Sequence, residues 1–162
     1  IRLSLVGSEM CIRDSFRIRL NPRTPNQIAA FYEARGFPDV ALDELRKTCF
    51  ITIGIHNKSK TILWFDLGNW RIHSPQGEVK RYLREDWRKR WTELGVEKRL
   101  QSTFRWTLMP EQLDFRPDEA EGGNIIIPRT DQPLTITGEV YLGEQKKNLY
   151  PLKFDNVICA TD

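Results

Sequence analysis

The strongest constraint on this chain is a two-residue alternation of apolar side chains that recurs in short segments. It is clearest in CFITIGIHN, residues 49–57, where Cys49, Ile51, Ile53 and Ile55 fall on one side of an extended chain. Seven other segments have strand character: 16–20, 62–65, 69–72, 112–115, 124–127, 134–142 and 150–159. A further strand is predicted at 103–108, where Phe104, Trp106 and Leu108 alternate. Turns separate these strands at roughly ten-residue spacing, which favours an antiparallel β-sandwich over alternating βαβ units.

Two short helices are predicted before the sheet. Thr24 followed by Pro25 has the chemistry of a helix start, and Gly36 that of a helix end. A second helix is expected over 38–48, with basic residues in its last turn.

A helical insertion is predicted near 80–95. Leu83, Trp87, Trp91 and Leu94 recur at spacings of four, four and three across the segment 79–100, and Gly95 is a natural stop. We expect this apolar stripe to lie over an edge or end of the sandwich.

Size and composition place the chain in one domain. It has 162 residues, of which 40% are hydrophobic and 29% charged, with a net charge of only +3. No apolar run reaches the roughly 18 residues of a membrane-spanning helix. We expect a single β-sandwich domain over residues 16–162.

Residues 1–15 do not share the alternating pattern of the rest of the chain. LVGSEMCIRDS, residues 5–15, resembles the translated sequencing-adapter read-through found at the ends of proteins translated from sequence assemblies. We expect a non-native or disordered segment, with the native start missing. The alternative is a native strand in which Leu3 and Leu5 alternate with polar residues.

Three stretches carry a resemblance to known domains: ITIGIHNKS, WFDLGNW and TLMPEQLDFRPDEAEGGNIIIP. In this order they resemble the small immunoglobulin-like sandwiches of bacterial extracytoplasmic proteins, over about residues 49–159. The resemblance implies a fold and a compartment, and no ligand. Two features depart from true immunoglobulin domains: no cysteine follows Cys49 at about 65 residues, and Val157 stands where a corner tyrosine would be.

Cys49 and Cys159 lie at the two ends of the expected sandwich and would suit a disulfide. The bond would close a loop of about 110 residues and contribute roughly 4–5 kcal/mol on the chain-entropy model. It would place the protein in an oxidising compartment, the periplasm or the outside of the cell. The alternative is a pair of buried, reduced thiols.

No catalytic residue, metal ligand or cofactor is predicted. His56 and His73 each end a strand, and either could act as a base, but no motif such as GxSxG supplies a nucleophile. We interpret them as polar edge residues. Asp118, Glu119 and Glu121 are read as a solvated turn, the alternative being a calcium loop.

The most distinctive polar feature is a basic, aromatic stretch at 80–99. It holds eight Lys or Arg against four acidic residues, and Arg84, Arg88, Lys89 and Arg90 form a possible binding surface. The acidic residues could equally pair with these side chains along the helix. We expect a non-catalytic extracytoplasmic module that binds another envelope protein. Nucleic-acid or acidic-surface binding through 80–99 is the alternative, and an enzyme of unknown class is the third.

Overall fold

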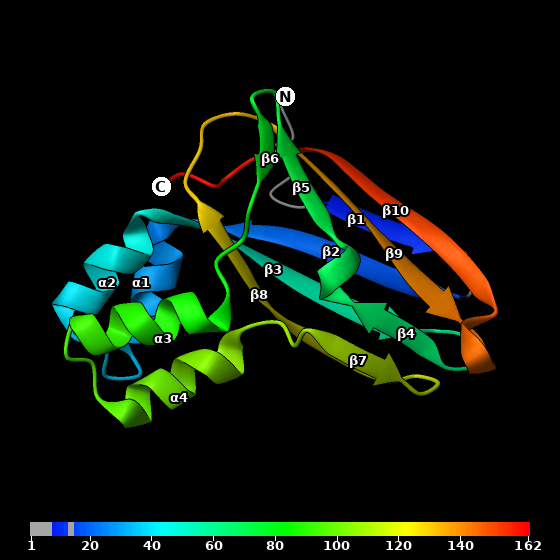
Figure 1. The fold of residues 1–162 in the computed structure, drawn as a ribbon, viewed down its shortest axis with the longest axis horizontal. Helices are drawn as coiled ribbons and strands as arrows, with labels where there is room; N and C mark the ends of the chain where they lie inside the picture. The colour runs from blue at the N-terminus through cyan, green and yellow to red at the C-terminus, as the bar shows by residue number, and fades with distance from the viewer. Residues whose placement is uncertain (1–7, 13–14) are drawn as a thin grey trace.

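The computed structural model describes residues 8–12 and 15–162, and it places two antiparallel sheets face to face with a helical layer at one end (Figure 1). Sheet A has the strand order β1-β2-β3-β8, with β1 Ser8–Ile12, β2 Phe16–Arg23, β3 Thr48–Asn57 and β8 Ala120–Pro128. Sheet B has the order β6-β5-β9-β4-β7. Strands β5 and β4 pair with different parts of β9, and β10 also pairs with β9. Its strands are β4 Leu63–Asp66, β5 Arg71–Ser74, β6 Gly77–Val79, β7 Gln112–Phe115, β9 Leu134–Leu142 and β10 Asn148–Val157.

The main core fills the space between the two sheets. Ile51, Ile53 and Ile55 of β3 are at most 2% exposed, and they share one buried cluster with Ile136 and Val140 of β9. This confirms the period-two prediction for most of the strands, because alternate residues of each bury themselves against the facing layer. The chain is mainly β and antiparallel, as expected.

A second core lies on the opposite face of sheet A, under the helices. The helices are α1 Pro25–Glu33, α2 Asp39–Arg46, α3 Arg84–Glu93 and α4 Lys98–Thr107. Phe50 of β3 and Ile126 of β8 point to this side, because they alternate with residues of the main core. The helices cover only that end of the sheet (Figure 1).

The two N-terminal helices begin as the sequence predicts. Thr24 accepts a hydrogen bond from the backbone N–H of Gln27, and the Gln27 side chain accepts one from the backbone N–H of Thr24, which completes a capping box with Pro25 in the first turn. Gly36 follows with a φ of 89°, a conformation that glycine adopts without strain. The second expected helix is α2.

The prediction of a strand at 103–108 is wrong, because most of that segment belongs to helix α4. Leu100, Phe104 and Leu108 are four residues apart and buried, whereas Trp106 is 81% exposed. A strand would have put Phe104 and Trp106 on one face. The single insertion expected near 80–95 is therefore the first of two helices, α3 and α4, separated by Gly95 at a φ of 70°.

Gly122 and Gly123 lie inside strand β8, which begins four residues before the strand predicted at 124–127. A Cβ on Gly123 would stand 2.6 Å from both Cα and N of Met109. The Met109 backbone N–H donates to the Asn124 carbonyl at 2.9 Å, so the chain leaving α4 runs against β8. Glycine permits this close approach of two backbones.

The N-terminal segment is described only in part. Ser8–Ile12 form strand β1, which pairs with β2 in an unbroken antiparallel register, so these five residues are not disordered in this structure. Residues 1–7 and 13–14 lie outside the described residues. That the segment is foreign to the protein stays a prediction.

A disulfide joins Cys49, near the start of β3, to Cys159, beyond the end of β10. Their Cα atoms are 5.6 Å apart, and both residues are buried. Arg129 donates to the carbonyls of Thr48 and Ala160 at 3.2 and 2.6 Å, the residues next to each cysteine. The bond therefore ties sheet A to the chain that leaves sheet B.

Candidate functional site

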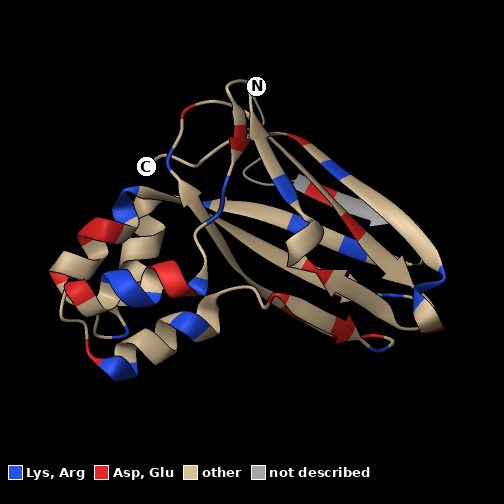
Figure 2. Cartoon of the chain, in the orientation of Figure 1, with Lys and Arg blue, Asp and Glu red and all other residues tan. Residues whose placement is uncertain are grey.

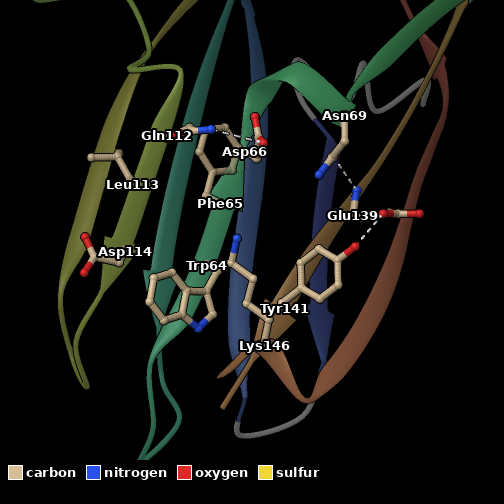
Figure 3. Close-up of a pocket in the computed structure, with 10 residues that line it drawn as sticks. All are labelled: Trp64, Phe65, Asp66, Asn69, Gln112, Leu113, Asp114, Glu139, Tyr141 and Lys146. Carbon is tan, nitrogen blue, oxygen red and sulfur yellow. Dashed lines mark hydrogen bonds between the residues drawn. The ribbon is translucent and has the colours of Figure 1, made fainter. Parts of the chain in front are cut away.

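The outer face of sheet B contains an open hollow of about 680 Å³, which is within the size range of ligand sites (Figure 3). We call it the β4–β9 hollow. Its lining residues come from β4, β7, β9 and the two short 3₁₀ turns η1 (Leu67–Asn69) and η2 (Glu144–Lys146). They are Trp64, Phe65, Asp66, Asn69, Gln112, Leu113, Asp114, Glu139, Tyr141 and Lys146.

Strand register brings the key side chains into two rows. In the first row, Trp64 of β4 is opposite Asp114 of β7 on one side and Tyr141 of β9 on the other. In the second row, Asp66 is opposite Gln112. Because side chains two apart on a strand share a face, Glu139 joins this face two residues before Tyr141. The intervening Phe65 and Val140 point inward and are buried.

The Trp64 ring is held in one orientation. Its Nε1 donates to the Gly143 carbonyl at 2.9 Å, so the indole N–H is already used and the ring presents its π face. The ammonium of Lys146 lies 5.4 Å from the ring centroid, within the range of a cation–π contact. The half-buried ring is thus a fixed, flat, weakly polar surface.

Hydrogen bonds also position the polar groups. The Tyr141 hydroxyl donates to Glu139 Oε2 at 3.0 Å, and this bond to the carboxylate raises the pKa of Tyr141. Asp66 Oδ1 accepts from the Gly68 N–H at 2.8 Å, and its Oδ2 accepts from Gln112 Nε2 at 3.4 Å. These contacts are visible in Figure 3 for the labelled residues.

The hollow is rich in hydrogen-bond acceptors. Three carboxylates, Asp66, Asp114 and Glu139, face one ammonium, that of Lys146. The side chain of Asp114 is exposed and makes no hydrogen bond or ion pair within the residues that the structure describes. Such a surface can bind a ligand that offers donors around a flat, apolar face.

The predicted basic surface is largely paired with acids. Arg90 makes a two-pronged contact with Glu44 of α2, at 2.8 and 2.9 Å, and also contacts Glu93. Arg88 pairs with Glu85 on its own helix. Figure 2 shows basic and acidic segments interleaved over α2 and α3.

Arg84 and Lys89 make no ion pair within 8–12 and 15–162, although the charge of Lys89 is close enough to add to the effect of Arg88, whose hydrogen bond lowers the pKa of Glu85. Trp87 and Trp91 of the same helix are buried in the second core, where they contact Phe104. The aromatic part of this stretch therefore packs inward. A binding role for its basic part stays a prediction.

The Glu44–Arg90 contact has an electrostatic consequence. Hydrogen bonds from Arg90 and Lys47 lower the pKa of Glu44 to about 2, and the hydrogen bonds that Arg90 donates to Glu44 and Glu93 raise the pKa of Arg90. Both groups are therefore charged near neutral pH, and the contact ties α2 to α3.

The two histidines lie on strands of different sheets, His56 on β3 and His73 on β5. His56 Nε2 lies 2.9 Å from Asp118 Oδ1, so this pair joins the end of β3 to the acidic turn before β8. His73 is exposed on β5. Within the described residues, no group of three or more His, Cys, Asp or Glu is arranged to hold a metal ion.

Asn57, the first residue of an Asn-Lys-Ser glycosylation triplet, is fully buried. Its Nδ2 donates to the carbonyls of Thr61 and Phe115 at 2.8 and 2.9 Å, which ties β3 to the chain of sheet B. The amide is therefore used inside the fold, and it is closed to a glycosyl carrier while the protein is folded.

Sequence reasoning did not identify the hollow. The sequence signal was the set of solvent-facing residues in each alternating segment. These are Trp64 and Asp66 in one segment, and Glu139 and Tyr141 in another. Aromatic residues at solvent-facing strand positions, with carboxylates two residues away, indicate a binding face more strongly than the basic helix did.

Comparison with known proteins gives remote structural likenesses. No protein-family model matches the chain, and no curated protein is significantly similar in sequence. The structure is similar to YjhA of Bacillus subtilis, with a TM-score of 0.48 and 9% identity over 93% of this chain and 98% of that one. It is also similar to YcdA of the same organism, described as a candidate lipoprotein, with a TM-score of 0.47 and 10% identity. That match covers 94% of this chain, which spans 39% of YcdA.

Among the described residues, the structure contains no helix with the length and apolar character needed to span a membrane.

Proposed function

We propose that this protein is a non-catalytic binding module of an extracytoplasmic compartment, and that its ligand binds in the β4–β9 hollow. The observation that carries the proposal is the pairing of Trp64 with Asp114 and Tyr141 across three neighbouring strands. These side chains are held on the outer face of a rigid sheet, where they stabilise no core. Binding sites on rigid elements need little reorganisation when the ligand arrives.

The Cys49–Cys159 disulfide supports the proposed compartment, because such bonds persist in oxidising surroundings and are rare in the cytosol. The periplasm or the cell exterior is therefore the address that we propose. The immunoglobulin-like character implied by the sequence resemblance belongs to the same proposal. An envelope protein or another envelope component is the expected partner.

Co-sedimentation with insoluble bacterial envelope material tests the site. We expect the folded wild-type protein to sediment with this material, and Trp64→Ala to lose the interaction. Trp106→Ala is the matched control, because it also removes one tryptophan, from the exposed side of α4 and outside the hollow. Equal sedimentation of all three proteins, or of none, would contradict the proposal.

The compartment has its own test. Protein isolated from its native host without reduction, then digested and mapped by mass spectrometry, should yield the linked Cys49–Cys159 peptides. Recovery of both cysteines as free thiols would contradict the proposed compartment. It would not bear on the proposal that a ligand binds in the β4–β9 hollow.

A further inference from the structure

We infer that the ligand of the β4–β9 hollow is a saccharide, whose pyranose ring stacks on Trp64 and whose hydroxyl groups donate to the surrounding carboxylates. This inference rests on the proposed function, since it names the ligand class of the same site. It follows from three properties of the hollow: a fixed ring, an excess of acceptors and an extended shape.

The ring accounts for the apolar part of the ligand. Because the Trp64 N–H is donated to Gly143, the indole offers the ligand a π face and no hydrogen bond. The C–H face of a pyranose is flat, and its C–H bonds point along the ring axis. Contact with an aromatic π face is favourable for such weakly positive groups. The Lys146 ammonium lies over this ring, so a sugar that stacks there displaces an exposed, flexible side chain.

The hydrogen-bonding balance accounts for the polar part. Asp114 has both carboxylate oxygens free within the described residues, and Glu139 uses only Oε2. Gln112 donates to Asp66 through Nε2, which leaves its carbonyl oxygen as a further acceptor. A ligand that fits must therefore bring several donors. Each sugar hydroxyl supplies one, and charged acceptors make the stronger hydrogen bonds.

The shape favours a chain of sugars over a point charge. The acceptors are spread across three adjacent strands, which corresponds to about 10 Å at the usual strand spacing. The hollow already contains a cation, the Lys146 ammonium. It lies at the Trp64 ring, where a cationic ligand would have to bind. A neutral, elongated ligand can use the ring and the neighbouring Asp114 together.

Isothermal titration with four probes tests the inference: cellotetraose, the tetramer of N-acetylglucosamine, the tetramer of glucosamine, and spermidine. We expect at least one neutral tetramer to bind wild-type protein with an affinity that changes little between about 50 and about 500 mM NaCl. Trp64→Ala should weaken this binding about tenfold or more, and Asp114→Asn should weaken it by a smaller factor. Trp106→Ala and Glu33→Gln, which lie on helices outside the hollow, should bind as wild type.

The outcomes separate the ligand class from the proposed function. Binding of both cationic probes, spermidine and the glucosamine tetramer, but of neither neutral tetramer, lost at high salt, would overturn the neutral saccharide and assign a cationic ligand. Absence of all tetramer binding, with Trp64-dependent envelope binding retained, would overturn the saccharide and leave the module. Loss of both would remove the proposed function itself. Circular dichroism and the urea midpoint of each variant exclude misfolding as the cause.

Discussion

Cys49 and Cys159 are joined across a sequence separation of 110 residues, and the bond lies between the carbonyl contacts that Arg129 makes to their neighbours. Loop closure in the unfolded chain is the main origin of the stabilisation that such a long-range bond provides. The bond also fixes the end of the chain beside the first residues of the central strand β3.

Replacing both cysteines by alanine should lower the free energy of unfolding by roughly 4–5 kcal/mol, the value expected for a loop of this length. Urea unfolding of the double variant measures the loss. Every protein compared should carry Cys11→Ser, so that the third cysteine cannot exchange with the disulfide. Reduced protein with its cysteines intact should match the double variant, and a loss below about 1 kcal/mol would contradict the entropic account.

Acid should weaken the attachment of α2 to α3 through Glu44. Its folded pKa is about 2, below the ordinary 4.5, so its ionised form stabilises the fold. This contribution is fully present above pH 4.5 and is lost as the pH falls toward 2. Urea midpoints measured over that range should fall less steeply in Glu44→Gln than in wild type. Glu33→Gln, on the exposed face of α1, should keep the wild-type slope.

Phe104 and Trp106 should respond very differently to alanine. Phe104 is 1% exposed and contacts Tyr32, Trp87 and Trp91, so Phe104→Ala should cost about 3–5 kcal/mol. Trp106 is 81% exposed, and its removal should change stability by about 0.5 kcal/mol or less. Chemical unfolding measures both losses. Similar losses at the two positions would indicate that Phe104 and Trp106 share a buried face, as the predicted strand at 103–108 requires.

Two glycines of adjacent strands offer a matched pair. Gly123→Ala places a methyl group 2.6 Å from the Met109 backbone, and should cost about 1–3 kcal/mol or displace the chain after α4. Gly54→Ala meets no atom within 4 Å and should be tolerated. Thermal unfolding of the two variants gives the comparison, and equal midpoints would mean that this approach of two backbones is not tight in solution.

The sandwich was predictable from sequence where burial is one-sided. From Ile51 to Asn57 each second residue faces the other sheet and the residues between are only partly buried, whereas Phe50 at the start of the strand is buried on the opposite face. The segment 103–108 misleads because Phe104, Trp106 and Leu108 satisfy a period of two by chance. The correct period of four appears only when Leu100 is included, and Leu100 is buried in a cluster that also contains Trp91 of another helix.

The site was less predictable than the fold, for a geometric reason. Asp114, Trp64 and Tyr141 lie far apart in the sequence, and only the register of β4 with β7 and β9 makes them neighbours. Register depends on how three separate segments pair, and no local pattern encodes that pairing. The Cys49–Cys159 contact was easier to anticipate, because only three cysteines occur in the chain and one of them falls in the segment set apart as foreign.

The helical layer has a consequence for the order in which the molecule assembles. Its four helices come from two stretches of chain that are interrupted by β3 to β6, and they meet over Phe50 and Ile126 of sheet A. Helices of eight to ten residues gain little stability by themselves. Helical structure in this protein should therefore mature together with strand pairing, at the pace of its long-range contacts.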